Sequence, residues 1–247
     1  MNRSSQLSLV SSAQGPTEQV CDEQGSWIID PTTKGRYRLV DSEGRFLGAN
    51  RDLSAWVNQP SQQWQLNAGP DGYYQLLNAA DQKPFTMTNC KAEDGALCQD
   101  WLLLPMGKTV VSSRQSGKVL STEDCTAGNN TLVTQQSWSK QGCQQWNWKA
   151  GQAGYVQLQN SLNPELCLIV KDDALATGAD LVLGNCAAKS SQWALQLLTN
   201  GAVSLLSHHT KQVVDLPSCS LFDGVGLKQT PEQSDAICQQ FQLRTAD

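Results

Sequence analysis

The four residues Cys143-Gln144-Gln145-Trp146, read CQQW, recur in altered form along this chain. The related stretches are SQQW at 61–64, CQDW at 98–101, SSQW at 190–193 and CQQF at 238–241. A catalytic site needs one converging set of reactive groups, so a motif scattered over the whole chain favours a repeated structural unit.

The aromatic residue that closes each copy gives the length of the repeat. Starting from Trp27, successive aromatics are 37, 37, 45, 47 and 48 residues apart. The chain therefore contains six repeats, which close on Trp27, Trp64, Trp101, Trp146, Trp193 and Phe241. We predict that these rings form a shared core, where burying each one contributes about 2–3 kcal/mol. The Gln two positions earlier is predicted to satisfy backbone groups at the end of a turn.

Each repeat after the first opens with a stretch in which apolar and polar residues alternate, as in a β-strand. These stretches are 37–42, 73–79, 108–113, 155–161 and 203–208. Further strands are predicted at 44–49, 117–122, 131–136 and 211–216. No segment has sustained helical periodicity, so the sequence predicts an all-β protein with about four short strands per repeat.

A unit of this size cannot bury a core alone, so several repeats must pack together. The repeat length changes near residue 106, and the segment LPMGK at 104–108 contains the Pro and Gly expected of a boundary. The sequence predicts two domains of three repeats each, at 1–106 and 107–247.

Charge and hydropathy exclude several classes of protein. The net charge is −5 and no Lys/Arg cluster is present, which argues against nucleic acid as a partner. Apolar runs such as LCLIV at 166–170 are too short to insert into a membrane. The N-terminal stretch lacks the apolar region of a signal peptide, whereas nine cysteines favour an oxidising compartment. We expect a secreted or extracellular protein that is trimmed from its precursor.

A Gln-x-Trp motif in units of about forty residues, three per domain, resembles the ricin B-type lectin family. The resemblance implies two tandem β-trefoils, the first of them smaller and degenerate. Residues 107–247 resemble one complete ricin B-like trefoil, and residues 1–106 an eroded one in which GRFLGANRD at 44–52 is also similar to fascin-like trefoils.

The cysteines fit disulfides within repeats better than a metal site. The predicted pairs are Cys90–Cys98, Cys125–Cys143, Cys167–Cys186 and Cys219–Cys238. Each later pair joins the region of the second strand to the residue before the aromatic strand. Cys21 is left over, either with a partner upstream of this sequence or as an unpaired buried thiol. No Cys-x-x-Cys spacing occurs and the two histidines are adjacent, so neither zinc nor a cofactor is expected.

In the ricin-like family an Asp, an aromatic platform and an Asn before the Gln hold the sugar. The sixth repeat keeps Asp215 and Gln239, has Cys238 at the Asn position, and offers His208 and His209 as a substitute platform or as inert turn residues. The second repeat offers Asn50, Asp52 and Trp56, although Trp56 could equally be a core residue. The acid position holds Met87, Ser121 and Ile169 in the third, fourth and fifth repeats.

The resemblance implies a carbohydrate-binding module with glycans or glycoproteins as partners, and we expect it to be the targeting part of a larger secreted toxin or hydrolase. The alternative is a β-trefoil without sugar binding that serves as a protein-interaction or protease-inhibitor module. No Gly-x-Ser-x-Gly elbow, phosphate loop or His-Glu-x-x-His motif is present, and no enzymatic activity is expected.

Overall fold

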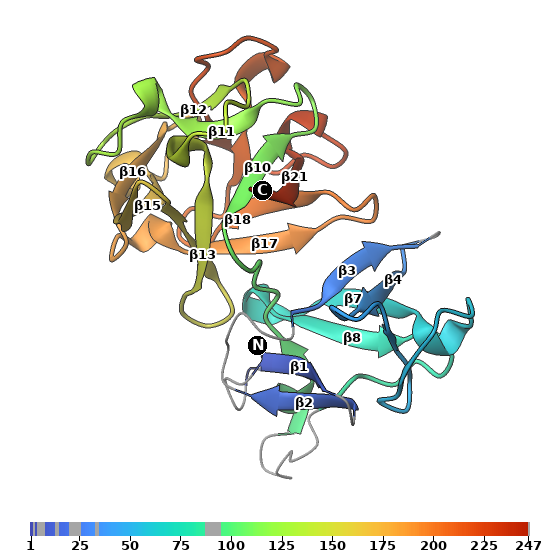
Figure 1. Ribbon diagram of the computed structural model, residues 1–247. Coiled ribbons are helices and arrows are strands. Elements are labelled where there is room, and N and C mark those ends of the chain that lie inside the picture. The colour runs from blue at the N-terminus through green and yellow to red at the C-terminus, as the bar shows by residue number, and fades with distance from the viewer. Residues whose placement is uncertain are drawn as a thin grey trace. The chain divides into compact units, whose positions relative to one another are not determined.

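The computed structural model describes residues 1, 3, 8–12, 15–19, 26–32, 35–86 and 95–246. Two compact units are present: Met1–Leu103 with Thr199–Gly201, and Leu104–Leu198 with Ala202–Asp247. The described residues form strands and short 3-10 turns without an α-helix (Figure 1). No helix in these ranges has the length and apolar character needed to cross a membrane.

The second unit is built on a barrel formed by the first and last strands of its three repeats. These strands are β10 (Thr109–Ser113), β13 (Trp146–Ala150), β14 (Val156–Asn160), β17 (Trp193–Leu197), β18 (Val203–Ser207) and β21 (Phe241–Thr245). Each pairs antiparallel with the next, and β21 pairs back with β10. The ring is therefore closed, which leaves no barrel edge to pair with another chain.

Three hairpins extend from this barrel, one per repeat. They are β11 (Val119–Thr122) with β12 (Val133–Gln136), β15 (Asn163–Val170) with β16 (Leu181–Asn185), and β19 (Val213–Asp215) with β20 (Lys228–Thr230). The first strand of each repeat also pairs with its hairpin. Three four-stranded repeats around one closed barrel constitute a β-trefoil, so the predicted fold class is confirmed.

The first unit uses the same pattern with shorter pieces. Its barrel-type strands are β3 (Ile28–Pro31), β4 (Tyr37–Val40), β7 (Trp64–Ala68), β8 (Tyr74–Asn78) and β9 (Asp100–Trp101), paired in that order. The hairpins are β1 (Ser8–Ser12) with β2 (Gly15–Gln19), and β5 (Phe46–Leu47) with β6 (Leu53–Ser54). Backbone hydrogen bonds also join Met1 to Leu102 and Arg3 to Asp100, so the first residues of the chain lie beside β9. Several described strands of this unit, such as β5, β6 and β9, have only two residues, as expected of a smaller and degenerate trefoil.

Short 3-10 turns connect the strands. They are η1 (Pro60–Gln62), η2 (Pro70–Gly72), η3 (Gly95–Gln99), η4 (Glu123–Cys125), η5 (Gly142–Gln144), η6 (Lys171–Asp173), η7 (Lys189–Ser191), η8 (Pro217–Cys219) and η9 (Ile237–Gln239). Five of them, η1, η3, η5, η7 and η9, end just before an aromatic strand. The recurring quartet is thus a turn that delivers one aromatic ring into the barrel.

The indole rings that close five of the six repeats are held in one way. Trp64, Trp101, Trp146 and Trp193 are buried, as is Phe241, while Trp27 is partly buried against the core of the first unit. Every one of the five indole nitrogens donates a hydrogen bond to a backbone carbonyl of the preceding second-strand region, at Leu9, Leu47, Phe85, Leu120 and Leu168. These five hydrogen bonds occupy equivalent positions, so one repeat geometry underlies both units.

The Gln of the motif holds the loop that precedes its own turn. In the fourth repeat, Gln144 Nε2 donates to the Ser137 carbonyl at 2.8 Å and Gln144 Oε1 accepts from the Ser139 amide at 2.7 Å. Gln62 and Gln239 bridge their loops in the same manner. The predicted backbone-satisfying role of this amide is confirmed in these three repeats.

The fifth repeat has Ser191 at the Gln position. There, Ser191 and Gln157 together bind the backbone of the loop that precedes the turn. Ser191 Oγ donates to the Cys186 carbonyl at 2.7 Å, and Gln157 Nε2, from the neighbouring strand β14, donates to that carbonyl and to Ser191 Oγ.

Three of the predicted disulfides are confirmed: Cys125–Cys143, Cys167–Cys186 and Cys219–Cys238. Cys98 is also disulfide-bonded. Its predicted partner Cys90 lies outside the described residues, and so does Cys21.

Candidate functional site

The sixth repeat brings its acid and its motif Gln together through a hydroxyl group. Thr230, at the end of β20, donates from Oγ1 to Asp215 Oδ2 at 2.5 Å. Gln239 Nε2 donates to Thr230 Oγ1 at 2.9 Å and reaches Asp215 Oδ2 at 3.4 Å. One carboxylate oxygen of Asp215 is therefore committed to the fold, and Gln239 is buried.

The second repeat contains the same arrangement at an unexpected residue. The registers Phe46↔Ser54 and Val213↔Thr230 make Ser54 the counterpart of Thr230, and they make Gly48 the counterpart of Asp215. The carboxylate of Asp52 fills the place beside Gly48, because a Cβ there would lie 2.2 Å from Asp52 Oδ1.

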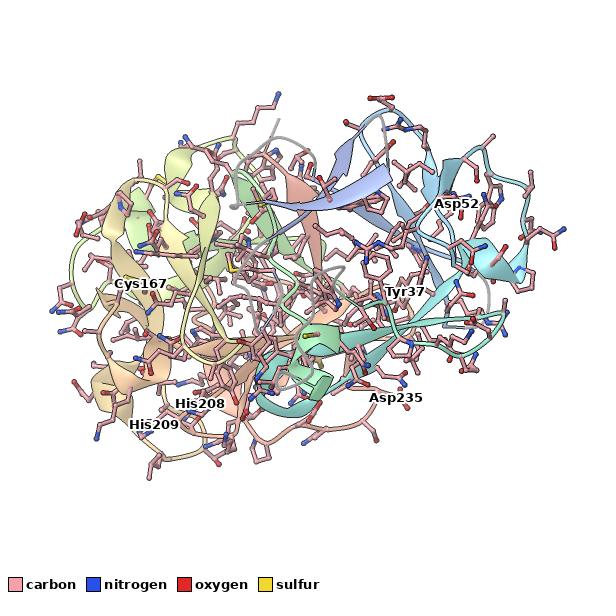
Figure 2. All side chains as sticks on the ribbon, turned by 90° about the horizontal axis from the view of Figure 1, so that it is seen from below. Tyr37, Asp52, Cys167, His208, His209 and Asp235 are labelled. Carbon is pink, nitrogen blue, oxygen red and sulfur yellow. A yellow bond between two sulfur atoms is a disulfide. The ribbon has the colours of Figure 1, made fainter. Side chains whose placement is uncertain are left out.

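The hydrogen bonds of the second repeat correspond to those of the sixth, with Gln62, Ser54 and Asp52 in the places of Gln239, Thr230 and Asp215. Gln62 Nε2 donates to Ser54 Oγ at 2.9 Å, and Ser54 Oγ approaches Asp52 Oδ2 at 3.5 Å. The long last contact and the exposure of Asp52 leave its carboxylate open to solvent, unlike that of Asp215. Figure 2 labels Asp52 beside the light-blue part of the ribbon. Asn50 is exposed in the same turn.

Trp56 lies two residues beyond Ser54 and is half-buried. Its ring packs on Phe46 with centroids 5.1 Å apart, and the Arg38 guanidinium lies 5.1 Å from the ring centroid. Arg38 is in turn paired with Asp30, its Nε donating to Asp30 Oδ2 at 2.6 Å. Packing thus fixes the orientation of the indole, while the Trp56 side chain stays partly exposed.

His208 and His209 belong to a different feature. They line a hollow of about 900 Å³ together with Gln152, Lys189, Gln192 and Lys211. Figure 2 shows the two histidines side by side on the orange ribbon. The described lining of the hollow includes neither Asp215 nor Gln239, so the structure does not bring the histidines to the acid of the sixth repeat.

Asp173 in η6 fixes one wall of this hollow. Its carboxylate accepts hydrogen bonds from the Ser190 amide at 2.9 Å, Ser190 Oγ at 2.6 Å and the Lys189 amide at 3.3 Å. Burial alone would raise the pKa of Asp173, but these hydrogen bonds and the nearby His209 outweigh it, so the pKa lies below its ordinary value.

Asp173→Asn is expected to destabilise the second unit by about 1 kcal/mol at pH 7, after allowing for solvent screening of a partly exposed group. The folded pKa is depressed, so this stabilisation is present above the unfolded value of about 3.9 and is lost as pH falls through the folded pKa. Urea unfolding at pH 7 and pH 3 measures it. The difference between wild type and variant should shrink at pH 3, and a constant difference would contradict the assignment.

The remaining repeats lack an acid at the equivalent position. Ser121 and Ile169 are buried there, and Met87 lies outside the described residues. Asp180 of the fifth repeat forms an ion pair in which its Oδ1 lies 2.6 Å from Lys228 Nζ. Within the described ranges, no three His, Cys, Asp or Glu side chains gather in a way that could hold a metal ion.

Sequence reasoning missed the residues that complete each site. Ser54 and Thr230 are ordinary strand residues whose role follows from strand register, which one sequence does not reveal. Lys189 and Lys211 are 22 positions apart and carry no motif. The similar spacing to the motif Gln, 8 residues from Ser54 to Gln62 and 9 from Thr230 to Gln239, is the signal that could have found the hydroxyl pair.

Comparison with protein families finds matches to the ricin-type β-trefoil lectin domain-like family at residues 97–184 and 142–230. No curated protein matches the sequence significantly. The designed threefold-symmetric protein ThreeFoil is similar at 26% identity with a TM-score of 0.54, over 56% of this chain and 98% of its own.

Two larger structures are similar over both units. A mosquitocidal holotoxin matches 98% of this chain at 17% identity with a TM-score of 0.51, and this chain spans 33% of it. An exo-β-1,3-galactanase from Clostridium thermocellum matches 90% of this chain and 69% of its own at 15% identity, with a TM-score of 0.54. At these low identities, the structural similarity shows a shared fold. The two family matches together extend from residue 97 to residue 230, more than half of the chain, so the protein belongs to the ricin-type β-trefoil lectin domain-like family.

Proposed function

We propose that this protein is a lectin whose principal sugar site is formed by Asp52 and Trp56 in the second repeat. The observation that carries the proposal is the open carboxylate of Asp52, four residues from a half-buried indole and held over Gly48. A carboxylate accepts hydrogen bonds from two neighbouring sugar hydroxyls, and an indole packs on the apolar face of a pyranose. Asn50 lies in the same turn as a further polar contact.

The site of the sixth repeat is the weaker one. Asp215 has one oxygen bound by Thr230 at 2.5 Å, and Gln239 is buried in the loop that it holds. No aromatic residue stands two positions beyond Thr230, where Glu232 occupies the place that Trp56 has in the second repeat. Asp215 and Gln239 therefore contribute polar contacts without a stacking platform.

Asp52→Ala and Trp56→Ala are each expected to reduce the affinity for the glycan at least about tenfold, because each removes one of the two groups proposed to bind the sugar. A glycan array identifies the ligand, and titration calorimetry measures the loss. Asp81→Ala and Trp138→Ala are matched controls, since Asp81 is an exposed Asp of the first unit and Trp138 is half-buried in a repeat that has Ser121 at the acid position.

Asp215→Ala discriminates between the sites. Full binding by Asp52→Ala together with loss in Asp215→Ala would transfer the function to the sixth repeat. Absence of binding to every glycan would refute the lectin proposal.

One observation favours the alternative of a protein-interaction module. Leu221 and Phe222 are adjacent in the chain and are 57% and 78% exposed. Apolar side chains of this size on a surface turn are typical of protein contacts. Retention of a host protein by the wild type but not by Phe222→Ser, in a chain that binds no glycan, would support it.

We also propose that the chain targets a larger secreted toxin or hydrolase to glycans. The support is architectural: structural neighbours over both units include a holotoxin and a galactanase, each longer than this chain. Isolation of the protein from its source with a covalently continuous catalytic or toxin domain would support this role. An intact mass equal to that of the present 247 residues would contradict it.

A further inference from the structure

The hollow beside His208 and His209 has an unusual charge. Among the residues that the structure describes, its charged and titratable lining consists of Lys189, Lys211 and the two histidines, without an acidic residue. The whole chain, by contrast, has a net charge of −5 and only two histidines. A concave surface lined by one sign of charge raises the local concentration of the opposite ion, here an anion.

The walls of this hollow are set before any ligand arrives. Gln192 Oε1 accepts from the Gln152 amide at 3.0 Å and lies against Gly151, where a Cβ would approach it to 2.0 Å. The His208 amide donates to the Gln192 carbonyl at 2.8 Å and so joins the histidine turn to the same wall. A site held in place by its own hydrogen bonds loses little entropy on binding.

The loop that carries Lys189 is anchored on both sides. The Cys167–Cys186 disulfide fixes its start, and the buried Gln157 holds the Cys186 carbonyl at 2.6 Å. Asp173 accepts from the Lys189 amide, as described above. These contacts engage the backbone of the loop, whereas the Lys189 side chain is exposed.

The histidine turn supplies an aromatic ring. His208 packs against Tyr155 with ring centroids 4.2 Å apart and ring planes tilted by 41°, and it remains exposed. Lys211 Nζ lies 3.4 Å from His208 Nδ1. The charged or titratable neighbours of the two imidazoles include Tyr155, Lys189, Lys211 and, beside His209, Asp173.

We propose that this hollow binds an acidic sugar, with its carboxylate or sulfate held between Lys189 and Lys211. A single oxyanion is far smaller than a hollow of about 900 Å³, which has the size of pockets that enclose a complete small molecule. The side-chain amides of Gln152 and Gln192 can exchange hydrogen bonds with sugar hydroxyls. The exposed side of the His208 ring can pack on the apolar face of a pyranose. The site is separate from Asp52 and Trp56 and does not depend on the function proposed for them.

Titration of the full chain with N-acetylneuraminic acid, galactose 6-sulfate, galactose and sodium sulfate tests the proposal. At least one of the two acidic sugars should bind at least tenfold more tightly than galactose and than sulfate alone. Added salt should weaken this binding, because the Debye length shortens to about 3 Å at 1 M.

The double variant Lys189→Ala/Lys211→Ala is expected to lose at least tenfold in affinity for the acidic sugar. Lys140→Ala/Lys149→Ala removes the same charge from exposed lysines of the same unit that do not line the hollow, and should retain the affinity. Gly151→Ala should also weaken binding, because it displaces Gln192 without changing charge.

Three results would overturn the proposal: equal binding of galactose, equal loss in the two double variants, or binding of sulfate as tight as that of the acidic sugars. Loss of acidic-sugar binding in Asp52→Ala would assign the ligand to the second repeat instead. Retained binding in that variant, with loss in Lys189→Ala/Lys211→Ala, separates this site from the proposed lectin site.

Discussion

Replacing Trp146 by Ala is expected to lower the free energy of unfolding of the second unit by about 3–5 kcal/mol. The ring is fully buried in the barrel, and its nitrogen donates to the Leu120 carbonyl at 3.2 Å. Removing it leaves a cavity among strands that have no free edge and cannot collapse inward. The carbonyl also loses its donor in the interior, which adds to the cost.

Trp146→Phe is the matched control for this prediction. The sixth repeat has Phe241 at the equivalent place, fully buried and without a donor nitrogen. The Phe variant therefore retains most of the apolar contact and should cost about 1–3 kcal/mol, chiefly through the hydrogen bond. Guanidinium unfolding followed by circular dichroism measures both variants. Equal destabilisation by Ala and Phe would show that the ring contributes little packing energy.

Removing the Cys167–Cys186 disulfide, as Cys167→Ala/Cys186→Ala, is expected to destabilise the second unit by about 3 kcal/mol. The bond closes a sequence separation of 19, and chain entropy gained by the unfolded state accounts for most of the loss. It also anchors the loop that presents Lys189. We therefore expect weaker binding of acidic sugar under conditions where the variant remains folded.

The Cys125–Cys143 disulfide is the control because it closes a separation of 18 in the same unit. Its removal should cost a similar free energy of unfolding, since the closed loops are nearly equal. Cys125 and Cys143 do not line the hollow, so acidic-sugar affinity should be unchanged at temperatures where both variants are folded. A large difference in stability between the two double variants would contradict the chain-entropy explanation.

Repeat spacing was sufficient to predict the fold because the same physical requirement recurs in every repeat. A short four-stranded unit must contribute one large ring to a common interior, and it must fix that ring at the end of a turn. Trp64, Trp146 and Trp193 show this requirement in the sequence as a closing aromatic, and in the structure as an indole bonded to the preceding strand. The three confirmed disulfides follow from the same repetition.

The first repeat was harder to interpret. Its hairpin of β1 and β2 contains few apolar residues and was not predicted. The Leu9 carbonyl nevertheless accepts a hydrogen bond from the Trp27 indole nitrogen, as in the other repeats. The strands are identified by their pairing with each other and not by periodicity.

The candidate sites were only partly predictable. Asp52 was named from its neighbourhood to Trp56, but its correspondence to Asp215 depends on a tight turn in which Arg51 has a φ of 62°. That turn carries the carboxylate back over Gly48, a distance relation that residue order does not encode. His208 and His209 were considered either as a substitute platform for the sixth repeat or as inert turn residues, and the structure joins the His208 amide to the Gln192 carbonyl of the fifth repeat.

The sequence by itself determined the repeat, the all-β class, the buried rings and the disulfides of the second unit, because each depends on residue type at a fixed spacing. Only the tertiary structure decided which polar groups meet. Strand register brings Ser54 to Asp52 and Thr230 to Asp215, and packing of neighbouring repeats places Lys189 and Lys211 in the lining of one hollow. A hydrogen bond or an ion site requires positions correct to a fraction of an ångström, and closure of the barrel sets those positions.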